Sequence, residues 1–337
     1  MTSTAPSLPA PRGPMSAALV AALSGGAPPA SLRASAVDAA DPFGEDLQLA
    51  LCLCYELHYR GFDGVASGWE WEPALLEVRR TLEAAFLSAL RAEVAGGDDV
   101  AAVLDEQLVE PVDGDGVSHH LRDHGELWQL REYVTHRSIY HLKEADPHAW
   151  VIPRLRGRAK AALVAVEYDE FGGGRAEMMH AQLFADLMDE LGLDSSYLAY
   201  LDAVPAPMLA TVNMMSMFGL HRALRGAMVG HFAVAEITTA PSAQRMADAL
   251  ERLGVGPRGT LFFTEHIEAD AVHEQILRRD VIGDLLRTEP DLAQDLVFGI
   301  QATNLLEERL GDHLLGCWRS DPVCSSLRSS FAVSDSG

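Results

Sequence analysis

The stretch FFTEHIEADAVHEQIL, residues 262–277, decides the fold prediction because its polar residues follow a helical repeat. His266, Asp270 and His273 are spaced by four and then three residues, which places them on one face of an α-helix. Phe262 precedes them on the same face, and further apolar residues follow, so this face is predicted to point into a core. The segment therefore predicts a long helix with three ionisable side chains turned inward.

Two interpretations of this His-Asp-His triplet are possible. Buried ionisable groups are costly unless they are paired or bind a metal ion. Imidazole together with carboxylate suits iron, manganese or zinc, whereas the absence of thiolate disfavours the soft metals. The alternative is a polar patch that neighbouring side chains satisfy. We favour the metal site.

The rest of the chain has the same helical character. Apolar residues recur at helical spacing, Gly, Pro, Asp or Ser marks each junction, and no segment alternates as a half-buried strand would. We predict an all-α fold with helices over residues 46–59, 73–94, 100–108, 124–144, 154–171, 176–191, 195–203, 207–217, 219–238, 242–253, 258–287, 290–299 and 301–316.

Composition predicts one helical domain between two flexible ends. Residues 1–40 are rich in Pro and Ala and are expected to form a flexible or loosely docked arm that carries one short helix. Residues 41–320 are expected to form a single domain, and residues 321–337 a flexible tail. With 48% hydrophobic residues, the chain can bury a sizeable core.

Charge and hydropathy limit the partners. The formal net charge of −23 argues against nucleic acid or an anionic membrane, and no run of eighteen apolar residues predicts a spanning helix. The four cysteines are interpreted as small buried hydrophobic residues in a reducing compartment. We therefore expect a cytoplasmic protein with a small-molecule substrate, and leave a homodimer open.

A second group of candidate ligands lies around the segment EYDEFGGGRAEMMH, residues 167–180. Glu177 and His180 are three residues apart, the spacing that builds carboxylate-bridged metal sites in helical bundles. Glu170 would share their face in a continuous helix, but the three glycines at 172–174 favour a turn from which Glu170 could still reach the site. A hydrogen-bonded core histidine is the alternative for His180.

The helix predicted over residues 219–238 supplies one more candidate. Its small residues, among them Gly226 and Gly230, permit a close approach to another helix. Glu236 follows an apolar face formed by Val229, Phe232 and others, which favours a ligand over a solvated role. The methionine-rich segment from Met208 to Leu220 could line a substrate channel, but we interpret it as core.

Taken together, these residues resemble the haem-oxygenase-like diiron oxidases, and more closely the bacterial iron-containing redox enzymes of that superfamily. The resemblance covers residues 120–318, with HRSIYHLKEADPHAWVIPRL (136–155), DEFGGG (169–174) and FFTEHIEADAVHEQI (262–276); PRGPMS (11–16) also matches. Phe171 departs from the pattern, in which a tyrosine is expected after the first Glu. The resemblance implies a bundle of about seven core helices.

The resemblance also implies a ligand set. One Fe(II) would be held by His180 with carboxylates, a second by His266, Asp270 and His273, and Glu236 would be shared or adjacent. Glu170 and Glu177 remain alternatives for the first-helix carboxylate, and Glu144 could add one from an earlier helix. Two Fe(II) ions in such a shell can together reduce O2, the expected co-substrate. The second iron is expected to bind weakly.

Members of the superfamily oxidise amino-acid, amine or fatty-acid substrates, so the implied function is an oxidase or oxygenase in a biosynthetic pathway. Two alternatives keep part of this prediction: the same fold without iron chemistry, as in cofactor-independent oxidases or thiaminase-like hydrolases, and a non-catalytic iron-binding protein. No catalytic residue beyond the metal ligands is predicted. Groups that orient the histidines are expected behind them, with His231, Tyr168 and Thr264 as candidates.

Overall fold

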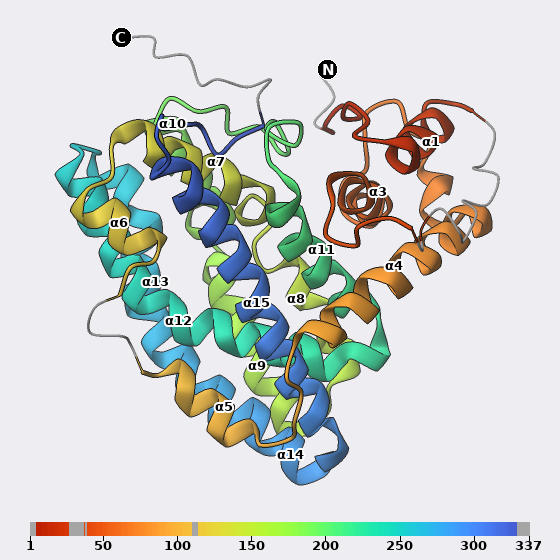
Figure 1. Cartoon of the computed structure of the whole chain (residues 1–337). Coiled ribbons are helices and arrows are strands. Elements are labelled where there is room, and N and C mark those ends of the chain that lie inside the picture. Colours follow the sequence, from red (N-terminus) through yellow and green to blue (C-terminus); the bar gives the residue numbers. More distant parts are fainter. Residues whose placement is uncertain (1–4, 27–36, 38, 110–113, 329–337) are drawn as a thin grey trace.

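The computed structural model describes residues 5–26, 37, 39–109 and 114–328, and within them it leaves the side chains of residues 268–271 undescribed. The described residues contain helices and turns and no β-strand, so the all-α prediction is confirmed. The long helices form one bundle in which α15 (Ala293–Trp318) runs along the front of Figure 1. None of the described helices combines the length and the apolar character needed to span a bilayer.

The centre of the bundle is helix α12 (Arg225–Arg252), which packs against α13 (Pro257–Gln275) and α15. Small residues allow this close packing, as the sequence predicted. A Cβ atom on Gly230 would lie 2.2 Å from the carbonyl oxygen of Leu296, and one on Gly299 would lie 2.0 Å from that of Ala227. Contacts this short mean that only glycine fits where α12 and α15 meet.

The remaining helices of the bundle surround this centre (Figure 1). Six of the predicted helices are confirmed within a few residues: α4 (Pro73–Glu93), α5 (Val100–Gln107), α7 (Leu127–His141), α9 (Gly157–Glu170), α10 (His180–Glu190) and α11 (Ala206–Leu220). Two short helices, α6 (Val117–Asp123) and α8 (Asp146–Ala149), were not predicted, and α14 (Gly283–Thr288) is the end of the helix predicted over residues 258–287.

Three helix predictions were wrong. Residues 195–203 form turns instead of a helix. Helix α12 continues through Pro241, where the sequence predicted a break, and the hydroxyls of Thr238 and Thr239 bond to carbonyls one turn earlier beside it. Helix α15 continues through residue 300, where a second break was predicted. Proline and local propensity were overridden at these points by packing along the whole helix.

Part of the expected N-terminal arm is packed onto the bundle. Helix α1 (Pro14–Leu23) buries Leu19 and Leu23 against α3 (Glu45–Glu56), and the amide of Met15 donates to Asp46 at 2.8 Å. The guanidinium of Arg12 bonds to the backbone of residue 201. The arm was expected to be flexible or loosely docked and to carry one short helix. Helix α1 is such a helix, and residues 5–26 contact the bundle through its apolar face and through Arg12.

The expected C-terminal tail also begins in contact with the bundle. The amide of Ser326 donates to Glu132 at 2.9 Å, and its hydroxyl lies 2.9 Å from Nε2 of His136. Ser326 and Leu327 are buried. The predicted flexible tail covers residues 321–337; its residues up to 328 include the contacts just described, whereas residues 329–337 lie outside the described residues and the prediction stays untested for them.

The helical chain continues beyond the end of α13 at Gln275. A π-helix of seven residues, Ile276–Ile282, joins it to α14, and it packs against α9. π-Helical turns within α-helices are rare and often lie at functional sites. Here the π-helix begins three residues after His273.

Candidate metal centre

Two clusters of buried metal-ligand side chains lie side by side in the bundle. Cluster A is Glu144, His180 and His266, and cluster B is Glu170, Glu236 and His273. Within each cluster, one potential ligand atom per residue lies within 4.8 Å of the others. Cluster A draws on the turn after α7 and on α10 and α13, whereas cluster B draws on α9, α12 and α13. The site therefore depends on five separate segments being held together by the core.

Glu170 faces both clusters. Its Oε2 lies 2.8 Å from Nδ1 of His180, and its Oε1 lies 3.6 Å from Nδ1 of His273. Although the first distance is short, the atoms are not aligned for a hydrogen bond, and both Nδ1 of His180 and Oε1 of Glu170 have no hydrogen-bond partner. Nδ1 of His180 and Oε2 of Glu170 are therefore better placed to bind one ion together than to bond to each other.

His266 is held in one tautomer by its own helix. Its Nδ1 lies 2.6 Å from the carbonyl oxygen of Phe262, which can only accept, so Nδ1 carries the proton. In the neutral ring, Nε2 then carries the lone pair, and it lies 3.8 Å from Oε1 of Glu144. The rings of His266 and His180 have centroids 4.3 Å apart. A backbone carbonyl thus orients His266 for coordination.

Glu144 reaches cluster A from a strained turn. The next residue, Ala145, has a φ of 74°, a left-handed conformation that is uncommon outside glycine. Oε1 of Glu144 lies 2.8 Å from Nδ1 of His141, while Oε2 has no hydrogen-bond partner. Burial alone would raise the pKa of Glu144, but His141 and His266 lower it below its usual value. Glu144 is therefore held as a carboxylate, the form that binds metal.

His273 lies between three carboxylates. Its Nδ1 is 3.0 Å from Glu236 and its Nε2 is 3.2 Å from Asp169, whose side chain is exposed. A neutral imidazole has one donor nitrogen. If Nε2 donates to Asp169, Nδ1 is left as the ligand atom that faces Glu236 and Glu170, and Asp169 takes the role of the orienting carboxylate.

Glu167 is a buried carboxyl that sequence analysis missed. Neither of its side-chain oxygens has a hydrogen-bond partner. Burial, followed by the negative charges of Glu170, Glu236 and Asp146, raises its pKa to about 9. The signal was present in the sequence, because Glu167 and Glu170 are three residues apart on one helix and so share a face.

The structure changes the predicted grouping of the triplet. His266 and His273 are seven residues apart, which corresponds to about 10 Å along a helix axis, too far for both to reach one ion without bending the helix. They lie instead in different clusters. The side chain of Asp270 lies outside the described residues, so its predicted role as a ligand stays a prediction.

The same-face arrangement predicted for Glu177 and His180 does not form. Gly172, Gly173 and Gly174 all have positive φ values, and the residue before His180 is extended, so His180 begins α10 instead of lying within a longer helix. Glu177 is exposed in a short 3-10 turn. Of the two alternatives for the first-helix carboxylate, the geometry favours Glu170.

The three candidates for orienting the histidines lie elsewhere. The hydroxyl of Tyr168 is exposed and donates to Gly173, and that of Thr264 donates to Leu261. His231 bonds to Thr303 at 2.9 Å. The groups that contact the ligand residues are instead the carbonyl of Phe262 and the side chains of Asp169 and His141, none of which was a sequence candidate.

The residues present fit a pair of divalent cations. Clusters A and B together offer three imidazoles and three carboxylates, a mixed donor set that suits iron, manganese or zinc. Three buried carboxylates near one another repel each other unless cations compensate them. Oε2 of Glu144 and Oε1 of Glu170 are buried without a hydrogen-bond partner, which suits atoms that coordinate a cation.

Both clusters open onto a cavity of about 680 Å³. Glu144, His266, Glu170 and Glu236 contribute to its wall, and helices α7, α12, α13 and α15 form most of the rest. Met215 reaches this cavity from α11, whereas the other methionines of that helix are buried in the core, as predicted for most of the segment. The volume is in the range of small-molecule sites.

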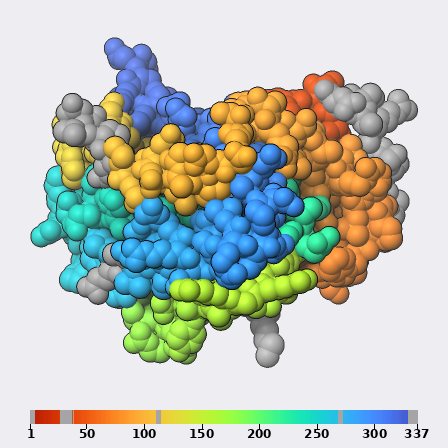
Figure 2. All heavy atoms as spheres, turned by 90° about the horizontal axis from the view of Figure 1, so that it is seen from below, coloured from red at the N-terminus to blue at the C-terminus, as the bar shows by residue number. Residues whose placement is uncertain are grey.

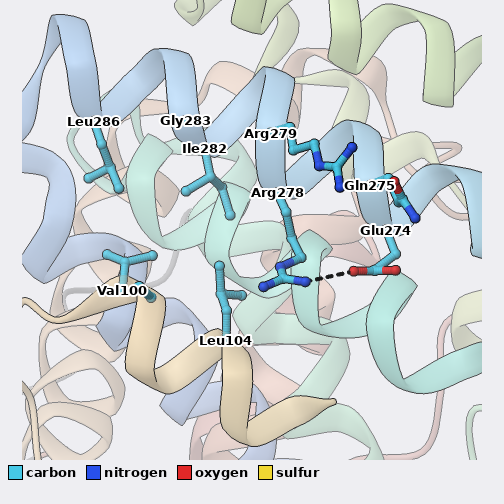
Figure 3. A pocket seen from close by; sticks show the side chains of 10 residues that line it. Val100, Leu104, Glu274, Gln275, Arg278, Arg279, Ile282, Gly283 and Leu286 are labelled. Atoms are coloured by element: carbon cyan, nitrogen blue, oxygen red, sulfur yellow. Dashed lines mark hydrogen bonds and ion pairs between the residues drawn. The ribbon is translucent and has the colours of Figure 1, made fainter.

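A second pocket, of about 330 Å³, is lined by residues of α5 and by residues 274–286 (Figure 3). Val100 and Leu104 of α5 face Ile282 across it, and Arg278 pairs with Glu274 at 3.0 Å within it. Figure 2 shows α5 lying across the residues that follow α13. This pocket contains no residue of cluster A or B, so it is separate from the candidate metal centre.

Comparison with known proteins agrees with this donor set. Residues 131–308 match the model of a family described as iron-containing redox enzymes. The chain belongs to this family. The matched residues include every residue of clusters A and B. The match confirms the resemblance seen in the sequence, and the family's description confirms the prediction of an iron-containing redox enzyme.

One curated relative is nitrosourea synthase of Streptomyces achromogenes subsp. streptozoticus. It is 27% identical over 172 residues, which are 51% of this chain and 36% of the relative. The chain thus matches about a third of that protein's length. The relative is named for the synthesis of a nitrosourea.

Proposed function

We propose that this iron-containing redox enzyme is a non-haem diiron oxidase or oxygenase. It would use O2 to oxidise a small amine, amino-acid or carboxylic-acid substrate in a biosynthetic pathway. The observation that supports two metal ions is the position of Glu170, whose two oxygens face different clusters. A carboxylate in this position is suited to bridging a pair of ions.

In this proposal, one Fe(II) binds to cluster A, a second binds to cluster B, and Glu170 is shared. Asp270 is retained as a further ligand beside cluster B, on the strength of its spacing in the sequence. The ion in cluster B is the more weakly held, since an exposed carboxylate, Asp169, orients its only histidine. Iron supplies the electrons with which O2 is reduced.

In this proposal, the protein itself contributes position, apolar surface beside the bound ions, and charge. The core of α12 and α13 holds Glu236, His266 and His273 at fixed separations, and Phe232 and Phe262 line the cavity with apolar surface. A dry cavity strengthens every interaction between the ligand carboxylates and a bound cation. It also protects a reactive site from water.

The relative's name supports a nitrogen-containing substrate. A protein that makes a nitrosourea handles nitrogen at a high oxidation state, so we place oxidation at an amine nitrogen first among the reactions considered. Oxidation of a carboxylic acid is the second candidate, because Arg245 also lines the cavity; Arg137 lines it too but is paired with Glu307.

The test is addition of Fe(II) to the metal-free chain without oxygen, followed by O2, while optical absorption and O2 concentration are recorded. We expect O2 uptake that depends on Fe(II) and increases with a suitable amine. Glu177→Ala is the matched control, since this exposed carboxylate is outside both clusters and its loss should change nothing. Tight Zn(II) binding with no Fe(II)-dependent O2 uptake would contradict the proposal, and iron binding without turnover would favour the non-catalytic alternative.

A further inference from the structure

A pair of buried histidines lies in the wall of the large cavity outside the two clusters. His148 of α8 and His231 of α12 are each 1% exposed, and their ring centroids are 5.3 Å apart. Both line the same cavity as Glu144 and Glu236. The sequence analysis considered His231 as a group that orients the ligand histidines, but the structure gives it another neighbour.

Hydrogen bonding fixes the tautomer of His231. The hydroxyl of Thr303 donates to the carbonyl of Gly299 at 2.7 Å, so its oxygen is left to accept. Nδ1 of His231, 2.9 Å from that oxygen, must then be the donor. Nε2 therefore carries a lone pair and no proton, and it has no hydrogen-bond partner. His231 presents a pure acceptor.

His148 is positioned by ring packing alone. Its ring stacks on that of Phe232 at 4.2 Å, with an angle of 20° between the planes, and both of its nitrogens lack partners. A neutral imidazole in this position offers one donor and one acceptor. Burial lowers the pKa of both histidines, to about 4 for His231, so the pair is uncharged at neutral pH.

Unpartnered nitrogens in a buried wall are costly, since each loses water without gaining a bond. A single nitrogen of this kind does not mark a site, since Nδ1 of the buried His136, which lies outside the cavity, also lacks a partner while its Nε2 bonds to Ser326. Three such nitrogens at one place in a cavity indicate a position where a ligand makes the missing bonds. Two of the three must accept and one must donate.

We propose that His148 and His231 bind a hydrogen-bond-donating group of the substrate, an O–H or N–H, and so help to orient the substrate in the cavity. A carboxylate or an ether oxygen has no proton to donate and would leave Nε2 of His231 unsatisfied. This rests on the proposed function in that the cavity is the substrate site. Of the substrate classes proposed above, it favours those with an amine or hydroxyl at this end.

The experiment compares two uncharged isomers, 1-pentanol and butyl methyl ether, because only the alcohol can donate a hydrogen bond. Each is titrated into the full-length protein as purified and after metal removal, with affinity measured by calorimetry. Histidine labelled with ¹⁵N in the metal-free protein reports directly on the ring nitrogens. Neither measurement uses O2 or turnover, so failure of the proposed oxidation would leave this result unaffected.

We expect the alcohol to bind about tenfold more tightly than the ether, which corresponds to about 1.4 kcal/mol. His231→Phe should reduce this preference to less than about twofold. His136→Phe is the matched control, because His136 is also fully buried but does not line the cavity, and the preference should persist in it. In the wild type, the alcohol should shift the resonance of Nε2 of His231, and the ether should not.

Equal affinities for the two isomers would overturn the proposal, as would an unchanged ¹⁵N resonance, since water alone would then satisfy the nitrogens. If His231→Phe has an altered melting temperature, the wild-type resonances and the His148→Gln variant decide the question. An alcohol preference that survives in both His231→Phe and His148→Gln would also contradict it.

Discussion

Replacing the buried Glu167 by Gln should stabilise the metal-free protein. At pH 7 the unfolded chain has this carboxyl ionised, because its ordinary pKa is near 4.5, whereas the folded chain keeps it protonated, with a pKa of about 9. Folding must therefore take up a proton at this position. Glutamine has the same shape and needs no proton.

The size of the effect follows from proton linkage. Each pH unit between the unfolded and the folded pKa costs the wild type about 1.4 kcal/mol, so the cost is about 3 kcal/mol at pH 7 and about 1 kcal/mol at pH 5. The sign is that of an acid with a raised pKa: its contribution to stability is fully present below pH 4.5 and is lost as the pH rises towards 9. The stability advantage of Glu167→Gln should grow with pH.

The assay is urea unfolding of the metal-free wild type and of Glu167→Gln at pH 5, 6 and 7, with free energies obtained by linear extrapolation. Glu177→Gln is the control, since that side chain is exposed and its change should be within about 0.5 kcal/mol. The reasoning is refuted if Glu167→Gln is destabilising at pH 7, or if its advantage does not change between pH 5 and pH 7. Bound iron should reduce the advantage by neutralising Glu170 and Glu236.

Three further predictions concern ligands, packing and local order. Glu144→Ala should bind about one iron per chain by colorimetric assay, whereas Glu177→Ala keeps two; equal iron contents would remove Glu144 from the ligand set. Gly299→Ala should lower stability by about 1–3 kcal/mol, because its Cβ would lie 2.0 Å from a carbonyl oxygen of α12. The control is Gly316→Ala on the same helix, which has open space around it and should be neutral or slightly stabilising in thermal melts. Similar melting temperatures for the two variants would contradict the packing argument. Residues 262–280 should exchange amide hydrogen faster without metal than with Fe(II), since cations remove the repulsion among the buried carboxylates; equal protection would indicate a preformed site.

Sequence periodicity predicted the helices and the inward face of the site because both depend on local spacing. His266 and His273 were correctly placed on one buried face. Their division between two clusters follows from the rise of about 10 Å over seven residues of a straight helix, but the carboxylates that join each of them were not predictable, because these depend on where Glu144 and Glu236 arrive from other segments. The spacing of residues within one helix does not predict which residues of other helices will lie beside it.

The clearest failure shows the same limit. Glu177 and His180 have the spacing of a metal-binding pair, but three glycines with positive φ separate α9 from α10 and leave Glu177 exposed. The position of Glu144 in cluster A depends on the left-handed turn at Ala145, and no residue type in this segment predicts that turn. Glu167 could have been found from its three-residue spacing to Glu170.

The most direct test of the central proposal is anomalous X-ray scattering at the iron edge from crystals of the Fe(II)-loaded protein. The proposal predicts two iron peaks, one among the residues of cluster A and one among those of cluster B, with Glu170 between them. A single peak, or iron outside these residues, would contradict a diiron centre shared through Glu170.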